Sequence, residues 1–394
     1  MMMLQNQRTI LCLATILFIV QEVSSLAQLS NAPTNATGDA QARPTGTGQP
    51  SGSDASSRSN SRSTRSSSRD SYVRLARAPN MFGDSLRPTG TLEFFQTVND
   101  PLQVDTFMSG ASNYNIAENN GALPTDRVYF VYNGFYNAIN FPGAGNTSLQ
   151  RYTLGFERTF FDGLWSVDLR MPFTSGFDLT TPFISTDSGN VGNLSIFLKG
   201  LMLREEDWAI SAGLGIGLPT GSDIVTNTFG NQVTIQNESV HLMPFLALSA
   251  APNDDWFLQA FTQLDFAASG NDVIAIQNRV GTFTEQNLFH ADIALGRWLA
   301  RDLGRPFLYG VASLLELHYA TTIQDTDVIN IAGNGLLSTL VNRFNRVDLL
   351  NLTAGLHFQL TPLSNFRVGA VTPLRANPDR TFDSELQVSF NRLF

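Results

Sequence analysis

The first candidate for chemistry in this chain is a serine close to a histidine. Ser239 and His241 are the only such close pair, and lipid hydrolysis would need a serine nucleophile, a histidine base and an orienting polar group near a membrane interface. Alternating side chains put both residues on the inner face of an expected strand, whereas a serine that attacks lipid must face the bilayer. The sequence also lacks a G-x-S-x-G elbow. We therefore expect no enzyme.

Metal and cofactor chemistry is equally poorly represented. The only cysteine, Cys12, excludes a disulfide framework and a cysteine-based zinc site. Gly213 to Gly217 (GLGIG) lacks the third spaced glycine and the following helix of a dinucleotide loop. None of the histidines shows a metal-binding spacing, so we expect polar filling, with no metal and no cofactor. The four histidines are His241, His290, His318 and His357.

Composition narrows the class further. The chain has 394 residues, of which 15% are charged, and its formal net charge is -9. Ordinary soluble domains carry about 25% charged residues. An acidic balance argues against nucleic acid as a partner, because phosphate contacts need a basic face.

The N-terminal quarter contains two segments that we exclude from the fold. Residues 1–27 form a predicted signal peptide, with Arg8, the apolar run Ile10 to Val20 and a small-residue cleavage site at Ser25-Leu26-Ala27. Residues 28–72 are rich in Ser, Thr, Gly, Asn and Pro and end in an Arg-Ser stretch. They cannot bury enough apolar surface to fold, so we expect a disordered linker, with a cationic tether as the alternative interpretation.

From residue 125 onward, apolar and polar residues alternate with a period of two in twelve segments. In 208–218, for example, Trp208, Ile210 and Leu214 fall on one face, while Ser211 and Gly213 fall on the other. The segments are 125–137, 149–160, 163–173, 192–203, 208–218, 239–251, 255–267, 287–300, 305–320, 346–361, 365–375 and 382–394.

The connections between these segments alternate between short and long, except for 376–381. Short turns on one side and long loops on the other are typical of outer-membrane barrels. A strand that crosses a bilayer needs about 9–11 residues, and closure is required because no backbone group can stay unpaired in lipid. We therefore predict an all-β, up-and-down antiparallel transmembrane β-barrel of about twelve strands over 125–394. The expected long connections are 138–148, 174–191, 219–238, 268–286 and 321–345.

Two details bear on this prediction. Trp208, Trp256 and Trp298 lie beside short turns, where aromatic girdles belong. Pro244 lies inside an expected strand and cannot donate to the ladder, so we expect a bulge or local fraying there.

The C-terminal strand carries a recognisable motif. It reads Leu386-Gln387-Val388-Ser389-Phe390-Asn391-Arg392-Leu393-Phe394 and resembles the assembly signal of Gram-negative outer-membrane β-barrels, with Leu386, Val388, Phe390 and Phe394 at the matching positions. Arg392 departs from the motif, although an arginine near the interface can snorkel. The segment Ala117 to Asn133 also resembles uncharacterised bacterial barrel proteins. These resemblances imply a bacterial outer-membrane location and the barrel-assembly machinery as a partner.

Residues 73–124 are open to two interpretations. Leu92 to Val98 and Gln103 to Met108 could be two more strands, which would give fourteen. Asn99-Asp100-Pro101 and the Gly/Asn-rich stretch 110–122 are poor transmembrane material. We therefore predict that residues 73–124 form an N-terminal plug in the barrel mouth or a periplasmic segment.

The polar faces of the strands place ionisable residues of both signs in the lumen. Opposed charges could form an eyelet that selects solutes, or they could pair with one another and fill the interior; at twelve strands a narrow channel becomes possible. The candidates are Arg127, Arg151, Glu157, Asp168, Arg170, Lys199, Asp265, Asp292, Glu316 and Arg367.

We predict a porin-like channel that passes small solutes passively across the outer membrane. The alternative is a non-conducting envelope protein that binds partners through its long extracellular loops. The expected partners are the lipid bilayer, the assembly machinery and small solutes.

Overall fold

The structure is a computed structural model of the chain, and its described residues up to Leu393 belong to one compact unit. The predicted signal peptide (1–27) and linker (28–72) lie outside the described residues. The structure describes residues 74–84, 86, 90–95, 101–106, 114–141, 145–175, 179–180, 184–187, 189–228, 231–305, 307–325, 327–333, 336–341 and 346–394. No helix among them is long and apolar enough to cross a membrane.

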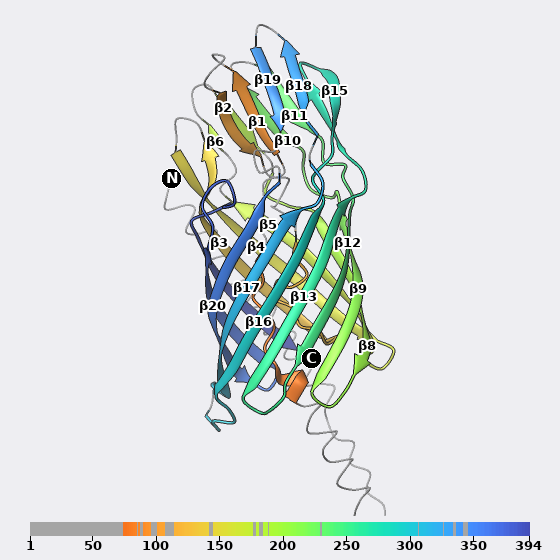
Figure 1. Cartoon of the computed structure of the whole chain (residues 1–394), viewed down its shortest axis with the longest axis vertical. Coiled ribbons are helices and arrows are strands. Elements are labelled where there is room, and N and C mark those ends of the chain that lie inside the picture. Colours follow the sequence, from red (N-terminus) through yellow and green to blue (C-terminus); the bar gives the residue numbers. More distant parts are fainter. Residues whose placement is uncertain are drawn as a thin grey trace, which may run out of the picture. The chain divides into compact units, whose positions relative to one another are not determined.

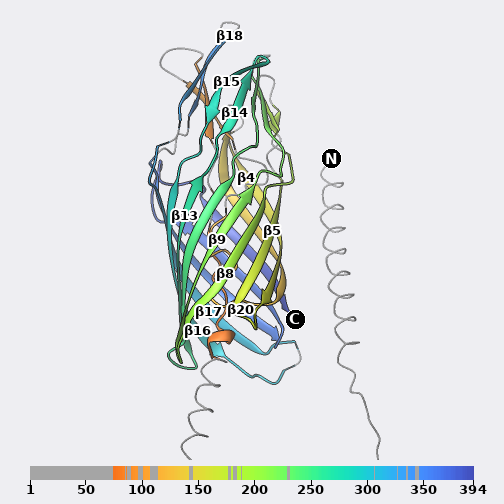
Figure 2. The same cartoon turned by 90° about the vertical axis from the view of Figure 1, so that its right-hand side faces the viewer.

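Twelve antiparallel strands form a closed barrel, in which β22 pairs with β3 to complete the ring (Figures 1 and 2). The prediction of twelve strands is confirmed. In chain order the strands are β3 (Arg127–Phe141), β4 (Gly145–Phe160), β5 (Trp165–Ser175), β8 (Leu194–Arg204), β9 (Trp208–Leu218), β12 (His241–Ala250), β13 (Trp256–Ala267), β16 (Leu288–Ala300), β17 (Gly310–Thr322), β20 (Asp348–Thr361), β21 (Ser364–Pro373) and β22 (Ser384–Leu393).

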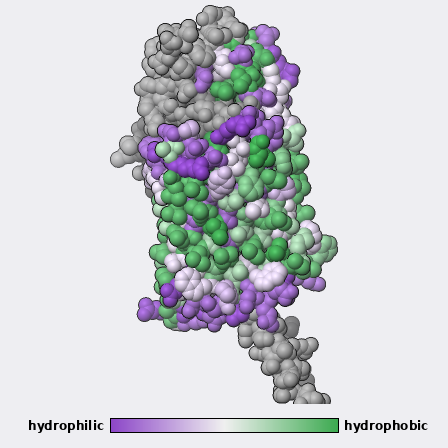
Figure 3. Space-filling view, viewed as in Figure 1, coloured by the Kyte–Doolittle hydropathy of each residue, from purple (hydrophilic) through white to green (hydrophobic). Residues whose placement is uncertain are grey.

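The alternating sequence pattern becomes an apolar outer face and a polar inner face. In β22, Leu386 and Val388 face outward and stay partly exposed, whereas Glu385 and Gln387 are buried inside. Phe394, just beyond the strand, is 46% exposed. Figure 3 shows the result on one face of the molecule, where a hydrophobic band crosses the barrel between hydrophilic rims. Such a band suits strands whose outer side chains meet lipid.

Pro244 is accommodated without a bulge. It stays in register opposite Leu214 of β9, while the ladder to β13 is interrupted only at Met243 and Pro244 and keeps its register on both sides of the gap. The missing N–H of proline therefore costs a local break in one ladder, as fraying predicts, and the expectation of a bulge is wrong.

The long connections contain strands that the sequence analysis did not predict, and residues 73–124 contribute two strands that overlap the possible strands 92–98 and 103–108. A four-stranded sheet has the order β18-β19-β1-β2, and a six-stranded sheet has the order β15-β14-β11-β10-β7-β6. The fourteen-strand alternative is wrong, because β1 pairs with β19 and β2 rather than with the barrel. These strands are β1 (Gly90–Phe95), β2 (Pro101–Thr106), β6 (Leu179–Thr180), β7 (Ile184–Asp187), β10 (Ile224–Thr228), β11 (Asn231–Ile235), β14 (Asn271–Ala275), β15 (Asn278–Phe283), β18 (Ile329–Gly333) and β19 (Leu336–Val341).

The two small sheets share one apolar cluster at the barrel end where the long connections lie, which we call the sheet end (Figure 1). Their side chains meet apolar residues from the barrel rim, such as Phe135 and Phe382. We call this cluster the apolar cap. Its members from the small sheets are Ile224, Val233, Ile235, Val273, Ala275, Phe283, Ile329, Ile331 and Leu340.

Two further stretches, residues 74–84 and 114–125, contact the inner faces of the barrel strands, and we call them the lumen segments. The first begins with a helical turn at 74–77, at the end where the short turns lie. There Arg74 Nη2 donates to Asp207 Oδ1 at 2.7 Å, next to the turn between β8 and β9. The chain then enters the β1–β2 hairpin of the sheet end and returns through the second lumen segment to β3. Both lumen segments therefore connect the short-turn end with the sheet end.

Candidate functional site in the barrel lumen

One wall of the lumen is basic. Arg127, Arg151, Arg170 and Lys199 project inward from β3, β4, β5 and β8, which are neighbouring strands in the barrel. Each side chain is at most 2% exposed. The sequence places them here because each occupies an inward position of an alternating strand. We call this surface the basic wall.

The opposite wall is acidic. Asp265, Asp292 and Glu316 project from the neighbouring strands β13, β16 and β17, and all three are buried. In the closed order of the barrel, β16 and β4 lie halfway round the ring from each other. Three of the five predicted carboxylates therefore lie opposite the basic wall, and we call their surface the acidic wall.

Carboxylates within the basic wall compensate part of its charge. The Glu157 carboxylate accepts a hydrogen bond from Arg127 Nε at 2.7 Å and lies 3.0 Å from Lys199 Nζ. Asp168 pairs with Arg170 at 3.0 Å and accepts a hydrogen bond from the Tyr129 hydroxyl at 2.7 Å. Buried charges need partners of this kind, because a buried charge without one carries a large desolvation penalty.

The lumen segments turn their acceptor groups toward the basic wall. Arg127 Nη1 donates to the backbone oxygen of Asn119 at 2.6 Å, and Lys199 Nζ donates to that of Gly121 at 2.9 Å. Arg151 Nη2 donates to the Glu118 carboxylate at 2.7 Å. Charge-assisted hydrogen bonds of this type are about twice as strong as neutral ones.

Donor groups of the lumen segments face the acidic wall. The Glu316 carboxylate accepts the backbone N–H groups of Phe82 and Gly83 at 2.8 to 3.0 Å. Asn115 Nδ2 donates to Asp292 Oδ2 at 2.8 Å. The lumen segments thus lie between the two walls with their backbone dipoles matched to the sign of each wall.

All ten predicted lumen residues are buried inside the barrel. Seven bond directly to residues of the lumen segments between 82 and 121, while Asp265 bonds to the wall histidine His241 and Asp168 bonds within the basic wall. Glu157 accepts the backbone N–H of Thr125 at 3.3 Å. Their role in solute selectivity stays a prediction. The seven are Arg127, Arg151, Arg170, Lys199, Asp292, Glu316 and Arg367.

Neutral lumen residues that the sequence analysis did not single out also hold the lumen segments. Gln263 accepts the N–H of Ile116 at 2.6 Å and donates to the oxygen of Tyr114 at 3.0 Å. Gln387 and Ser211 donate to backbone oxygens of Gly83 and Ala122. The sequence offered one signal for these residues, because each is a polar side chain at an inward position of an alternating strand.

Phe82 anchors the first lumen segment by packing against glycine. A Cβ added at Gly355 or Gly369 would come within 2.3 or 2.9 Å of the Phe82 ring. The Arg367 guanidinium also lies over the Phe82 ring, with its Cζ 4.1 Å from the ring centroid. Only residues without a side chain at these two positions allow the ring to lie against the wall.

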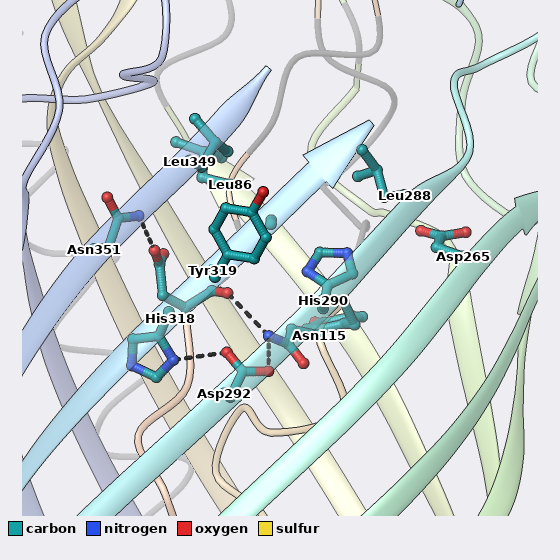
Figure 4. Close-up of a pocket in the computed structure, with 13 residues that line it drawn as sticks. Leu86, Asn115, Asp265, Leu288, His290, Asp292, His318, Tyr319, Leu349 and Asn351 are labelled. Atoms are coloured by element: carbon teal, nitrogen blue, oxygen red, sulfur yellow. Dashed lines mark hydrogen bonds and ion pairs between the residues drawn. The ribbon is translucent and has the colours of Figure 1, made fainter. Parts of the chain in front are cut away.

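A small cavity of about 30 Å³ lies beside the acidic wall toward the sheet end, which is room for one or two water molecules (Figure 4). His318 Nδ1 lies 2.8 Å from Asp292 there, and Asn351 bonds to Asp84 of the first lumen segment. Leu86, Leu288 and Leu349 form its apolar side.

The Ser239–His241 pair is arranged unsuitably for catalysis. His241 Nδ1 lies 2.7 Å from Asp265, and its Nε2 lies 3.5 Å from both Glu285 and Ser239 Oγ. The serine hydroxyl donates instead to the backbone oxygen of Ser269 at 2.7 Å. Glu285 competes with Ser239 for the same histidine nitrogen, and the serine hydroxyl is already engaged by Ser269.

Among the described residues, no group of three or more His, Cys, Asp or Glu side chains is placed to hold a metal ion. The four histidines are all buried in the lumen, as the strand pattern predicts.

Trp298 departs from the predicted aromatic girdle. Trp208 and Trp256 are 36% and 41% exposed on the outer face, but Trp298 packs inward against Phe257 and His357. Its neighbour Leu299 is the outward residue, at 57% exposed. Strand alternation accounts for this orientation, because Trp298 pairs in register with Ala312 and lies an even number of residues after the inward-facing Asp292.

Comparison with known proteins gives weak structural likenesses only. No protein family and no curated protein matches the sequence. Among solved structures, the NanC porin is 9% identical over 68% of this chain and 98% of its own, with a TM-score of 0.40. An outer membrane channel from Pseudomonas putida F1 is 12% identical over 70% and 97%, with a TM-score of 0.45. The beta domain of the Bordetella autotransporter BrkA is 16% identical over 68% and 100%, with a TM-score of 0.41. Likenesses of this degree assign neither a family nor a solute to the chain.

Proposed function

We propose that this chain is an outer-membrane β-barrel that passes small solutes through its lumen, with the lumen segments acting as a plug. The observation that carries the proposal is the division of the closed barrel into an apolar outer face and a charged inner face. Backbone groups at a sheet edge cannot stay unpaired in lipid, and the closed ring satisfies this requirement.

The polar contacts around the lumen segments support a path that can open. Hydrogen bonds and ion pairs join the segments to the two walls, beside apolar packing of side chains such as Met81 and Ile116. Water and dissolved ions can replace the polar contacts, whereas they cannot replace the apolar ones. A cavity also lies at each end of the lumen segments, toward the sheet end and toward the short-turn end. Rearrangement of these segments would therefore open a hydrated route.

The polar walls also give the route a transverse electric field, in the manner of an eyelet. Arg170 and Asp292 are a matched pair for testing it, because they lie on opposite walls and both contact Asn115. We expect Arg170→Gln to shift the reversal potential in planar bilayers toward cation selectivity and Asp292→Asn to shift it toward anion selectivity.

Purified protein that shows heat-modifiable gel mobility is the material for these recordings, since that mobility demonstrates a folded barrel. Conductance with opposite shifts for the two variants supports a channel with opposed walls. Conductance without either shift would mean that ions pass through the barrel but that Arg170 and Asp292 do not set its selectivity. Folded protein that conducts at no voltage would overturn the channel.

The alternative is a non-conducting envelope protein that acts through the small sheets. One observation favours it: β1 lies between β19 and β2 in the four-stranded sheet, so the hairpin that joins the two lumen segments is paired with β19 along its β1 side. This arrangement restrains the plug from the sheet end. Deletion of residues 224–235 should then abolish surface binding, and conductance would be absent both before and after the deletion.

A further inference from the structure

A second and larger cavity lies at the short-turn end of the lumen, between the start of the first lumen segment and the barrel wall. Its volume is about 160 Å³, which is space for on the order of ten water molecules. The proposed passage of solutes does not require a binding site here. The lining, however, combines cationic, amide and aromatic groups in a pattern suited to a small organic anion.

The charged groups of the lining are mostly positive. Arg77, Arg127 and Arg301 line the cavity together with one carboxylate, Asp302. Arg127 is already neutralised by Glu157 at 2.7 Å. The other two arginines are paired only loosely.

Arg301 is the better placed of these two. Its Nη2 lies 3.7 and 3.8 Å from Asp255 and Asp254, beyond hydrogen-bond distance, and its side chain is only 23% exposed while those carboxylates are more than 60% exposed. Arg77 lies 4.0 Å from Asp302. Exposed pairs of this kind are weak, so a bound anion can compete for both guanidinium groups.

A buried nitrogen without a partner points to the same cavity. His357 is 2% exposed, and its Nε2 donates to Gln359 Oε1 at 3.0 Å. The Nδ1 of the neutral ring is therefore an acceptor, and it has no hydrogen-bond partner among the described residues. Buried polar atoms are nearly always paired, and an exception at the wall of a cavity indicates a missing ligand group or solvent.

The aromatic part of the lining is the inward-facing Trp298. Its ring meets the His357 ring edge-on, with centroids 5.6 Å apart. An indole beside a cationic group gives a surface that accepts the hydrocarbon part of a ligand, while polar donors nearby fix its charged end.

We propose that this cavity binds a small organic monocarboxylate, whose carboxylate is held by Arg301 and whose hydrocarbon part lies against Trp298. The site is open to the short-turn end, because the side chain of Arg77 at its rim is about half exposed. Binding here does not depend on solute passage, since the carboxylate enters and leaves from the same side.

The probe is benzoate, with benzamide as its neutral counterpart of nearly equal size. Titration of folded protein in detergent should quench tryptophan fluorescence with benzoate, and benzamide should bind at least about tenfold more weakly. Trp298→Phe should remove most of the quenching, whereas calorimetry should still detect the bound benzoate.

Arg301→Gln should weaken benzoate binding about tenfold or more, as expected for loss of a charged hydrogen bond. Arg158→Gln is the matched control, because Arg158 near the same barrel end is also loosely paired, at 3.7 Å from Asp126, but does not line the cavity. The control should leave the affinity unchanged.

Three results would overturn the proposal: equal binding of benzamide, quenching that survives Trp298→Phe, or equal effects of the two arginine variants. Protein that binds benzoate but conducts no ions would keep this site and overturn the channel instead, so the two proposals fail separately.

Discussion

The lumen segments and the apolar cap are held by different mixtures of contact. The lumen segments bond to the barrel through buried charges and amides, such as Arg151 with Glu118 and Glu316 with the N–H groups of Phe82 and Gly83. They also pack apolar side chains against the barrel. The cap is held by packed apolar side chains, including Val233 and Phe283, and by backbone ladders.

The polar share of the lumen contacts makes the lumen segments easier to rearrange than the cap. Polar contacts in the lumen can be exchanged for water at a modest net cost, because each hydrogen bond contributes only about 0.5–1.5 kcal/mol net. Each apolar side chain of the cap contributes about 1.5–3 kcal/mol by burial, and water offers it nothing in return. We therefore expect lumen substitutions to change conductance and cap substitutions to change stability alone.

The largest expected effect comes from the buried pair of Arg151 and Glu118. Arg151→Ala leaves the Glu118 carboxylate buried without this arginine, and we expect a loss of about 3–5 kcal/mol in the free energy of unfolding. Because the pair joins the second lumen segment to β4, the open probability in planar bilayers should rise as well. Denaturant titration followed by gel mobility measures the first quantity.

A double variant tests whether charge or contact matters. Arg151→Met combined with Glu118→Leu removes both charges and keeps the volume, so it should recover most of the lost stability. A double variant as unstable as Arg151→Ala would contradict the view that the loss comes from leaving the buried carboxylate without this arginine.

In the cap, Ile235→Ala should cost about 2–4 kcal/mol by removing buried methyl groups from β11. Hydrogen exchange should accelerate in β10, β11 and β14, while single-channel conductance stays unchanged. A change in conductance of the same size as that of Arg151→Ala would erase the distinction between the two regions.

Gly369→Ala tests the close approach of Phe82 to the wall. The added Cβ would lie 2.9 to 3.2 Å from the Phe82 ring and from no backbone atom, and overpacking of this size costs about 1–2 kcal/mol. We expect more frequent channel openings with little loss of barrel stability. Ala370→Val, on the outer face of β21, is the control and should leave the openings unchanged.

The sequence predicted the twelve barrel strands because each has one face toward lipid and the other toward polar groups, and that alternation persists for ten or more residues. The small strands of the cap are too short to stand out in the same way; β10 and β11 have five residues each. Partners in the lumen were beyond prediction, since Glu316 meets the N–H of Phe82 across 234 residues of chain. The position of Trp298 next to a short turn suggested a girdle, but alternation from the inward-facing Asp292 of the same strand already placed its side chain in the lumen.

The smallest effect is expected for the exposed pair of Asp272 and Arg279, which links β14 and β15. Hydrogen bonds from Arg279 and Thr282 hold the pKa of Asp272 below its usual range. The stability gained from ionised Asp272 is therefore fully present above the ordinary aspartate pKa near 4 and is lost as the pH falls through the lowered value. Because the pair is exposed, the effect stays local and small.

Hydrogen exchange of β14 and β15 at neutral and acidic pH measures this effect. Asp272→Asn should remove the part of the protection that disappears in acid, whereas Asp187→Asn on β7 of the same sheet should leave it in place. Neither variant should alter conductance, because neither residue contacts the lumen segments. If Asp272→Asn changed the open probability as strongly as a lumen substitution, the small sheets would be coupled to the plug, and the cap would have to be regarded as part of the gate.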